Sequence, residues 1–553
     1  MTQSSAALLA FSPRRAKWLV AIAISSVIVI FHYYFSTHAG GFWRDEVNLI
    51  NLSGKPSLAD MKKDSFPVLM PLLVRSWRDL GLDDGTQLRL LGMLIGLGVP
   101  AALWLVAWIA RRSAPLLGLA LFGLNGTLLV FGDSIRAYGL GCLLIVLTVA
   151  AAIAFLRRPQ WMRAGLLAAA AVLSVQTLYH NAVLVGAICL GGMTVCARRK
   201  NWLAAGQVFF AGLLAALSLL PYLRVLFGGE ATTVVIRSGL EGWRFFSAFR
   251  DVLGFPFPEY ICIWAALALG LMVLAGITLS RVPQNPSPIA DADDFRLFAG
   301  ITVVTAFIGF VLFLWLAAFP SQSWYLLPLV ALAAACIEIG FSIGQGRRCF
   351  LILALAIVSV AMTIPAASRV LHYRFTNVDR WARKLSATVS PEDYIVVTPW
   401  FDGISFNYYF RGSTPWTTIP PLPDHSAHRY DLVKLQIQNT NAIQPVLKQI
   451  IETLQGGHRV WLLAGAGLVD VPSAGTSPLP DLPPAPLKNS GWSEAPYTMV
   501  WNSQIAQLLA DHAVRFGPVD NPAAGLPFIE DTELFLAEGW TDSAQTKDES
   551  KKF

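Results

Sequence analysis

Long apolar runs recur along the first two-thirds of the chain, separated by short polar connections. Most runs are close to the length with which a helix crosses a hydrocarbon core of about 30 Å. Strands of a membrane barrel would instead alternate in polarity over short segments. The pattern predicts eleven membrane-spanning helices, at approximately residues 18–36, 86–110, 115–131, 137–156, 164–179, 182–197, 203–226, 260–280, 297–319, 323–344 and 349–368.

The last third of the chain has the pattern of a soluble domain. Residues 381–385 and 446–454 are predicted helices, whereas 394–397 and 459–463 are short apolar runs of strand length. Helix and strand therefore alternate, as they do in a small α/β domain. The proline-rich stretch from Pro472 to Pro496 is expected to form an irregular loop, and residues 541–553 a disordered tail.

The predicted fold is a polytopic α-helical membrane protein with a small C-terminal α/β domain. We expect a membrane module over residues 1–372 and the α/β domain over residues 373–540. Two long connections of the module, residues 38–85 and 227–259, place apolar and aromatic residues among lysines and arginines. This mixture predicts helices that lie along the membrane interface. The first span is expected to remain as an anchor, because no small-residue cleavage site follows it.

Composition agrees with a membrane protein and narrows the classes of function. The mean hydropathy is +0.53 and only 14% of residues are charged, whereas about a quarter are charged in soluble proteins. All six cysteines lie at or before Cys349, so no disulfide framework or metal cluster is predicted in the α/β domain. The net charge of +7 comes largely from residues at the ends of apolar runs, which argues against a nucleic-acid partner.

The basic residues predict the orientation of the spans. Lysines and arginines gather at alternate connections, which are expected on the cytoplasmic side. They are Arg14, Arg15 and Lys17, then Arg111 and Arg112, Arg157 and Arg158, Arg198 to Lys200, Arg281, and Arg347 and Arg348. The N-terminus is then cytoplasmic. The loops 38–85 and 227–259 and the α/β domain are expected on the outer side.

An acidic pair, Asp45 and Glu46, follows directly after the first predicted span. Ionised groups near a hydrocarbon boundary are costly unless they face a wet cavity or a partner, so the pair is a candidate functional site. The alternative is that it simply begins a solvated loop.

Other polar residues return to the outer ends of spans and would line the same outward cavity. They are Asp133, Arg136 and Tyr138 before the fourth span, and Tyr179, His180 and Asn181 between the fifth and sixth. Asp133 and Arg136 are also spaced as an ordinary i,i+3 ion pair on a helix. His180 is equally explained as a histidine at the end of a helix.

These motifs together resemble a known family. The segments are the acidic pair after the first span, Phe66-Pro67-Val68-Leu69-Met70-Pro71, Arg136-Ala137-Tyr138, Tyr179-His180-Asn181 and Trp324-Tyr325-Leu326-Leu327-Pro328-Leu329. In this order they resemble the GT-C membrane glycosyltransferases. The similarity is greatest to the bacterial protein O-mannosyltransferase and lipid A aminoarabinose transferase group, which includes the rhizobial galacturonosyltransferase type. It covers the membrane part to about residue 370 and the general layout of the C-terminal domain.

The resemblance implies an inverting transfer from a polyprenyl-phosphate-linked sugar to an acceptor hydroxyl. It implies an enzyme of the bacterial inner membrane with a periplasmic C-terminal domain. The acidic residue of the first outer loop would be the general base, which is Asp45 here, with Glu46 beside it. A positioned base is typically worth ~10²- to 10⁴-fold in rate. The acceptor would be a lipid, a glycan or a protein. The resemblance does not identify the sugar.

The same resemblance requires cations for the departing phosphate, because its negative charge grows in the transition state. Arg136 is the first candidate, followed by Lys62, Lys63, Arg237, Arg244 and His180. The substrate cavity would include Asp133, Tyr138, Tyr179, Asn181 and Tyr325. The sequence shows no spacing of metal ligands and no cofactor motif. A divalent cation paired with Asp45 and a phosphate remains chemically possible.

One position departs from the family's pattern. Related enzymes often have Arg-Tyr-Leu-Leu-Pro where this chain has Trp324 before Tyr325. Either another basic residue replaces that arginine, for instance from the 227–259 loop, or the donor is held differently. Two other classes of function stay open: a lipid or polysaccharide transporter or flippase, and a membrane-anchored scaffold. A transporter predicts acidic or basic residues in span interiors, where Glu338 is the main acidic one.

Overall fold

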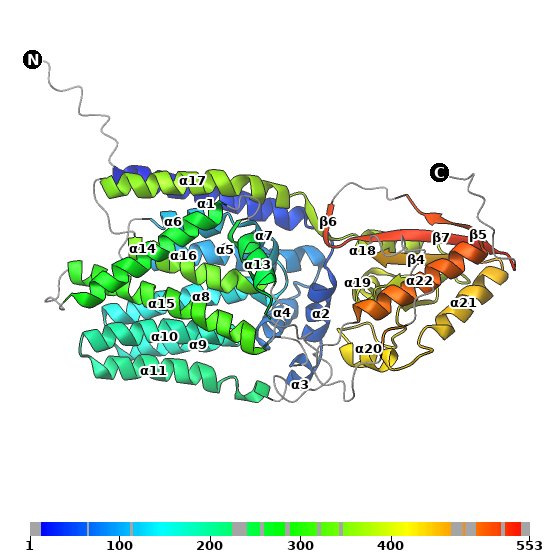
Figure 1. The fold of residues 1–553 in the computed structure, drawn as a ribbon, viewed down its shortest axis with the longest axis horizontal. Helices are drawn as coiled ribbons and strands as arrows, with labels where there is room; N and C mark the ends of the chain where they lie inside the picture. Colours follow the sequence, from blue (N-terminus) through cyan, green and yellow to red (C-terminus); the bar gives the residue numbers. More distant parts are fainter. Residues whose placement is uncertain are drawn as a thin grey trace, which may run out of the picture. The chain divides into compact units, whose positions relative to one another are not determined.

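The structure is a computed structural model that describes residues 13–62, 66–110, 114–223, 240–254, 259–281, 288–317, 322–341, 347–465, 479–481, 494–520 and 526–542 (Figure 1). The described residues form two compact units. Unit 1 draws on Met1–His38, Phe66–Leu223 and Ser238–Leu371, and unit 2 on Ala39–Ser65 and His372–Phe553. The first predicted outer loop is thus divided, and its first half belongs with the C-terminal domain.

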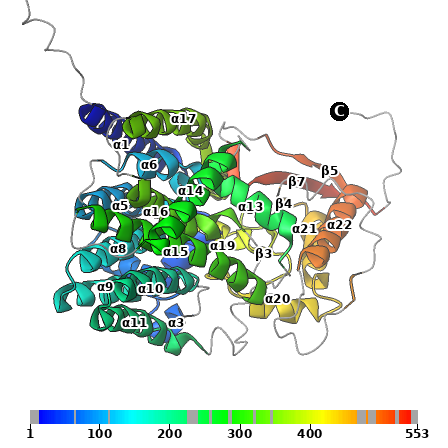
Figure 2. The same ribbon diagram turned by 60° about the vertical axis from the view of Figure 1, so that its left-hand side comes forward.

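Unit 1 is built from helices. In chain order they are α1 (Pro13–His38), α4 (Leu69–Asp79), α5 (Gly85–Ile109), α6 (Leu116–Gly118), a π-helical turn η1 (Leu119–Gly123), α7 (Gly126–Gly132), α8 (Ala137–Arg157), α9 (Trp161–Val175), α10 (Asn181–Arg198), α11 (Trp202–Leu217), η2 (Leu220–Tyr222), α13 (Gly242–Gly254), α14 (Tyr260–Ser280), α15 (Pro288–Ala317), η3 (Ser323–Leu326), α16 (Leu327–Phe341) and α17 (Arg347–Val370). The long helices run side by side (Figures 1 and 2).

Nine helices of the described part are long and apolar enough to cross a membrane, where the sequence predicted eleven. The predicted span at 115–131 is interrupted instead. It passes through α6 and η1 and restarts at α7, where the Asn125 side chain accepts the Leu128 backbone N–H at 2.9 Å. The predicted span at 164–179 is α9, which has 15 residues and is shorter than a usual crossing.

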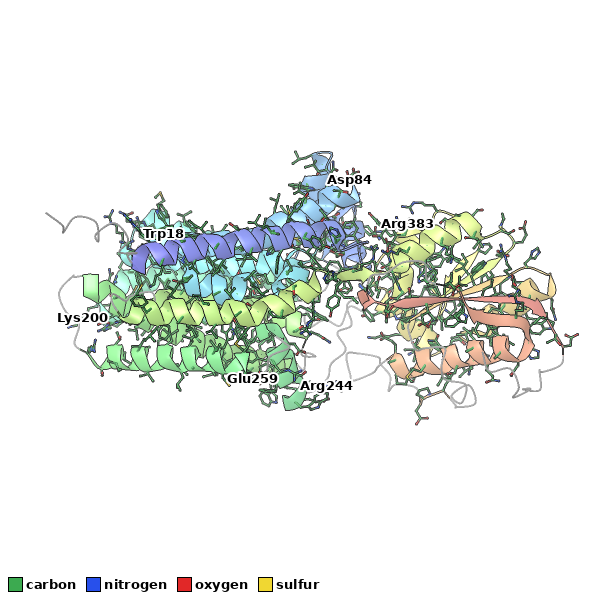
Figure 3. All side chains as sticks on the ribbon, turned by 90° about the horizontal axis from the view of Figure 1, so that it is seen from above. Trp18, Asp84, Lys200, Arg244, Glu259 and Arg383 are labelled. Carbon is green, nitrogen blue, oxygen red and sulfur yellow. The ribbon has the colours of Figure 1, made fainter. Side chains whose placement is uncertain are left out.

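The connections between the helices lie at the two ends of the unit 1 bundle. Trp18 and Lys200 lie at one end, and Asp84, Arg244 and Glu259 at the other (Figure 3). At the Lys200 end, arginines close the C-termini of helices: Arg157 donates to the Ile109 carbonyl and Arg199 to the Leu156 carbonyl. Cations there oppose the negative end of each helix dipole. Both arginines belong to the basic connections from which the sequence predicts the orientation of the spans, and that orientation stays a prediction.

Unit 2 contains α2 (Arg44–Ser53) and α3 (Leu58–Met61) from the first loop, followed by the C-terminal elements. These are β1 (Tyr373–Thr376), α18 (Val378–Thr388), β2 (Tyr394–Thr398), α19 (Asp402–Tyr409), β3 (Trp416–Thr418), α20 (Tyr430–Ile437), α21 (Gln444–Gln455), β4 (Val460–Gly465), α22 (Ala495–His512), β5 (Ala513–Pro518), β6 (Leu526–Glu530) and β7 (Thr532–Trp540). The strands and helices predicted near 381, 394, 446 and 459 are all present, so the α/β prediction is confirmed.

The main sheet of unit 2 has five strands in the order β3-β2-β4-β7-β5. Strands β3, β2 and β4 are parallel, with Ile395 between Trp416 and Trp461, while β7 runs antiparallel to β4 and β5. Every residue of β2 is buried, as expected for a strand covered on both faces. Helices α21 and α22 pack along strands of this sheet (Figure 2). A second, two-stranded sheet pairs β1 with β6.

The first-loop helix α2 is predicted correctly as a helix but does not expose its apolar face. Val47, Leu49, Ile50 and Leu52 are all buried. The hydrophobic residues that suggested a helix along the membrane surface are instead buried in the protein, and α2 packs against α19 of the same unit.

Candidate functional site

The start of helix α2 gives the two acidic neighbours different environments. Glu46 is fully buried, and its carboxylate accepts the backbone N–H of Trp43 at 3.3 Å. A carboxylate three residues into a helix that reaches back to the residue before it is a normal capping arrangement. Asp45, by contrast, keeps 21% of its side chain exposed. Of the predicted pair, only Asp45 can meet a substrate without a rearrangement.

Asp45 is held by a histidine of the C-terminal domain. The Nε2 atom of His428 lies 3.0 Å from Oδ1 of Asp45, and the His428 side chain is 18% exposed. Two further hydrogen bonds fix the same contact: Asn48 accepts the backbone N–H of His428 at 3.0 Å, and Asn51 donates to the Ser426 carbonyl at 2.8 Å. Three residues on one face of α2 therefore bind the segment that carries His428.

The residue before Asp45 is also bound by the C-terminal domain. The Arg44 guanidinium lies 3.5 Å from Asp402 and 3.6 Å from Glu530, and its backbone N–H donates to Glu530 at 2.7 Å. Ser405 donates to the same Glu530 carboxylate at 3.0 Å. The Arg44 side chain covers the Phe401 ring, with 4.2 Å from Cζ to the ring centroid.

The two carboxylates beside Arg44 compete for one positive charge. Burial raises the pKa of Asp402 to about 6, although Arg44 opposes the shift. Burial, and after it the charge of Asp402, raises the pKa of Glu530 to about 8, again with Arg44 opposing. Glu530 therefore carries a proton near neutral pH, and Arg44 is balanced mainly by Asp402.

The sheet topology explains why these residues meet. Asp402 begins the helix that follows β2, and His428 lies between the end of β3 and the start of α20. Strands β2 and β3 are parallel neighbours, so the segments after them emerge at the same edge. Binding sites of α/β domains lie beyond the carboxyl ends of parallel strands, near the point where the strand order reverses. Here β3 and β4 lie on opposite sides of β2, and helix α2 is bound at that edge.

In unit 1, Arg136 lies in a cluster of aromatic rings. Its side chain is 3% exposed, and its Cζ lies 4.7 Å from the centroid of Phe66. The Phe66 ring meets Tyr138 edge-on at 5.4 Å, and Tyr138 lies 6.1 Å from Tyr325. The structure therefore brings three segments of the predicted set together: the Phe66–Pro71 motif, Arg136-Ala137-Tyr138, and the motif that contains Tyr325.

His180 joins this cluster from another helix. Its ring centroid lies 6.5 Å from Tyr325 and 5.6 Å from Phe310. The Nε2 atom is buried and has no hydrogen-bond partner among the described residues. A buried nitrogen with that character is the kind of group that a ligand could satisfy.

The neighbours of His180 have structural contacts. The Asn181 side chain donates to the Gly141 carbonyl at 3.3 Å and to the Ser174 hydroxyl at 3.2 Å, which joins the start of α10 to α8 and α9. The Tyr179 ring packs edge-on against Tyr222 at 5.6 Å. These contacts explain Asn181 and Tyr179 without a ligand.

Asp133 lies inside the bundle and is bonded to α1. It is 2% exposed, and its Oδ1 lies 2.7 Å from Nδ1 of His32. The glycines of α5 permit this approach, because a Cβ at Gly96 would lie only 1.8 Å from the Asp133 carboxylate. The structure thus gives Asp133 a partner on another helix, His32, which the i,i+3 spacing considered from the sequence did not suggest.

Two of the other predicted cations, Arg244 and Lys62, lie among the described residues. Arg244 is exposed on α13 and forms an ion pair with Glu241 at 2.9 Å (Figure 3). Lys62 ends the short helix α3. Lys63 and Arg237 lie outside the described residues. At the position of the missing arginine, Trp324 packs against Phe131, with 4.6 Å between ring centroids.

Glu338, the acidic residue that a transporter would use, has a structural role. It is 2% exposed and accepts the backbone N–H groups of Leu117 and Gly118 at 2.8 and 2.9 Å. Glu338 therefore accepts backbone N–H groups at the start of α6, which would otherwise lack a partner within the helix. Within the described ranges, no group of three His, Cys, Asp or Glu side chains is arranged to hold a metal ion.

Sequence reasoning missed the residues that surround Asp45. His428 is 383 positions away from Asp45, and Glu530 is 486 positions from Arg44. One signal was present. The segment from Asp424 to Asp431 carries two histidines, an arginine and two aspartates within the predicted α/β domain. The sequence did not predict strand β3 before it, and so did not show that this segment follows the carboxyl end of a strand, where α/β domains place their sites.

Comparisons with known proteins describe the fold. No family model matches the chain, and no curated protein sequence matches it. The chain is similar to the crystal structure of ArnT from Cupriavidus metallidurans bound to undecaprenyl phosphate, with 12% identity and a TM-score of 0.48 over 81% of this chain and 93% of that one.

Two further solved structures are similar at the same level. The arabinofuranosyltransferase AftD from Mycobacteria matches with 15% identity and a TM-score of 0.44, over 95% of this chain and 40% of that one. The Archaeoglobus fulgidus oligosaccharyltransferase tethered with an acceptor peptide matches with 10% identity and a TM-score of 0.47, over 95% and 74%. Both are sugar-transferring enzymes by name. At such identities, and with TM-scores below 0.5, the similarity supports no residue role or substrate.

Proposed function

We propose that this protein is an inverting glycosyltransferase that moves a sugar from a polyprenyl-phosphate donor to an acceptor hydroxyl on the outer face of the membrane. The observation that carries the proposal is the state of Asp45. Asp45 follows the first span, stays partly exposed and is hydrogen-bonded to His428. Its neighbour Glu46 is buried and caps the helix. The order of the sequence motifs supports the same reaction class.

The chemistry assigns one proton to Asp45. The acceptor oxygen attacks the anomeric carbon from the face opposite the phosphate, the bond from that carbon to the phosphate oxygen breaks, and the lipid phosphate leaves with both electrons. The hydroxyl proton passes to the Asp45 carboxylate as the new bond forms. One displacement on one carbon inverts its configuration, and no covalent enzyme intermediate is needed.

We assign the lipid phosphate to Arg136. A planar guanidinium binds phosphate oxygens through two parallel hydrogen bonds, and the Cζ atom of Arg136 lies over the Phe66 ring. Through Phe66 and Tyr138 it belongs to the same aromatic cluster as Tyr325, next to the position where related sequences carry the missing arginine. Arg136 is therefore our candidate for its replacement, with His180 deeper in the cluster.

Mass spectrometry of envelope lipids and glycans from a strain lacking the gene tests the proposal. We expect one sugar to disappear from its acceptor and a polyprenyl-phosphate-linked form of that sugar to accumulate. The gene restores the modification, and the gene with Asp45→Asn does not. An unchanged envelope in the deletion strain, or full restoration by D45N, would contradict the proposal.

A further inference from the structure

His428 has no assigned role in the reaction, yet its Nε2 atom lies 3.0 Å from the Asp45 carboxylate. It belongs to the C-terminal α/β domain, in the segment between β3 and α20. Its ring stacks on Tyr430, with centroids 5.9 Å apart and planes 16° apart, and meets Trp400 edge-on at 6.0 Å. Together with the Asn48 contact to its backbone, these rings allow the imidazole little freedom.

The hydrogen bonds indicate which ring nitrogen carries the proton. An ionised Asp45 carboxylate only accepts, so Nε2 of His428 must donate across the 3.0 Å contact. Nδ1 is buried and has no hydrogen-bond partner among the described residues. A second proton on Nδ1 would leave a buried N–H donor unpaired, which is unfavourable. The neutral tautomer with the proton on Nε2 therefore fits this environment.

A neutral imidazole in this position acts as a fixed donor. It cannot neutralise the carboxylate, as an arginine would, so Asp45 keeps its capacity to accept a proton. It does fix the direction of the carboxylate, because one oxygen is held by a ring that is itself held by Tyr430 and Trp400. General-base catalysis depends on that direction, since a misplacement of about 1 Å can reduce the rate ~10²-fold.

We propose that His428 is a positioning residue for the Asp45 carboxylate, so that the C-terminal domain completes the reaction centre. This inference rests on the proposed transferase function. It predicts that any side chain that offers an N–H at the place of Nε2 will serve, and that one whose N–H lies elsewhere will not.

Two substitutions with the same chemistry test this. The amide nitrogen of glutamine can occupy the place of Nε2, whereas the amide of asparagine is one methylene shorter and falls near Nδ1. We expect His428→Gln to keep kcat within about 5-fold of the wild type, and His428→Asn to lose about 10- to 100-fold in kcat, with the donor KM changed by less than about 2-fold in both. The exposed His372 supplies matched controls, His372→Gln and His372→Asn.

The assay uses the full chain in lipid nanodiscs. Its donor is the polyprenyl-phosphate-linked sugar extracted from the strain lacking the gene. The double variant Asp45→Asn/His428→Asn is expected to be no slower than Asp45→Asn alone, because a positioning residue has nothing left to position. Thermal unfolding of each variant separates a lost fold from a lost rate.

The outcomes are distinct. If His428→Asn transfers at the wild-type rate, or if His428→Gln is as slow as His428→Asn while both unfold at the wild-type temperature, the positioning role is wrong. In the first case the contact has no effect on the reaction, and in the second the imidazole itself moves a proton. If the wild type transfers no sugar, the proposed function fails and the inference fails with it.

Discussion

Arg44 in unit 2 and Arg136 in unit 1 are arginines beside predicted site residues, but their surroundings differ: the Arg44 side chain is 22% exposed, and Arg136 is 3% exposed. Arg44 lies 3.5 Å from Asp402 and 3.6 Å from Glu530, so its charge is used within the protein. Arg136 lies over the Phe66 ring, in a cluster with Tyr138 and Tyr325. A guanidinium carries both a face that can stack on a ring and N–H donors of the kind that bind phosphate, so the aromatic surroundings of Arg136 are compatible with the proposed role.

The comparison teaches that a position beside a predicted site residue does not by itself identify a ligand-binding cation. The same residue type is expected to support the fold in one unit and the substrate in the other. Substitutions of the two arginines should therefore separate: one should lower stability, and the other should lower activity at nearly constant stability.

Arg44→Met tests the structural half of the comparison and should have the largest effect. It leaves Asp402 and Glu530 without their shared cation, and removing one partner of an enclosed ion pair is costly. We expect the Tm of the full chain to fall by about 5–10 °C, and more at pH 8 than at pH 5, where protons neutralise both carboxylates.

Thermal unfolding followed by fluorescence measures this loss. Arg515→Met is the matched control, because Arg515 is 82% exposed and pairs with Glu538 at 3.5 Å. Its Tm should change by less than about 2 °C. Equal shifts in both variants would mean that the Arg44 cluster does not stabilise unit 2.

Arg136→Gln tests the substrate half. We expect kcat/KM for the lipid-linked donor to fall about 10- to 100-fold, because a cation aimed at the leaving phosphate is lost. The kcat/KM of Arg136→Lys should lie between those of the wild type and Arg136→Gln, since lysine keeps the positive charge but not the planar guanidinium that makes two parallel hydrogen bonds. Steady-state kinetics with the extracted donor measures both. A large fall in Tm with normal kcat/KM would place Arg136 in the same class as Arg44.

The pH dependence of stability tests whether Glu530, which lies beside Arg44 and Asp402, is protonated in the folded protein. The pKa of Glu530 is raised from 4.5 to about 8 by burial and Asp402. Between these values the folded state binds more protons than the unfolded state, so the free energy of unfolding falls as pH rises. We expect the Tm to fall by a few degrees between pH 6 and pH 9, since each kcal/mol of lost stability lowers the Tm by about 2–4 °C.

Glu530→Gln removes this titration and should flatten the decline, while the wild type retains it. Melting curves of both proteins at half-unit pH steps measure the difference. The same slope in both would show that Glu530 does not titrate in this window.

The smallest effect is expected at Glu46, beside the proposed base. Glu46→Ala removes the acceptor for the Trp43 N–H and should cost about 1 kcal/mol, whereas Glu46→Gln retains an accepting oxygen and should cost less. Chemical unfolding of both variants measures this. If Glu46→Gln lost stability as fully as Glu46→Ala, the negative charge and not the hydrogen bond would hold the helix.

The sequence predicts the elements of this fold well where periodicity is local. Apolar runs give most of the spans, and short runs near 394 and 459 give β2 and β4. Local patterns do not reveal that the segment at 115–131 breaks at Asn125, because the apolar run continues through the π-helical turn.

The candidate site is predicted only in part for a different reason. Asp45 can be found because an acidic pair after a span is unusual. His428 cannot be paired with it, because the partnership depends on which strands are neighbours and on helix α2 binding at their edge. The different exposures of Asp45 and Glu46 likewise depend on where helix α2 begins. Because the helix begins after Trp43, Glu46 and not Asp45 lies where its carboxylate can accept the Trp43 N–H.

The most direct test of the central claim is single-turnover transfer by purified Asp45→Asn and wild-type protein with the extracted lipid-linked sugar. Asp83→Asn is the matched control, an exposed aspartate of the same predicted outer loop. The account predicts a loss of at least ~10²-fold for Asp45→Asn, with an unchanged Tm, and a wild-type rate for Asp83→Asn. Transfer by Asp45→Asn at the wild-type rate would show that another group accepts the proton.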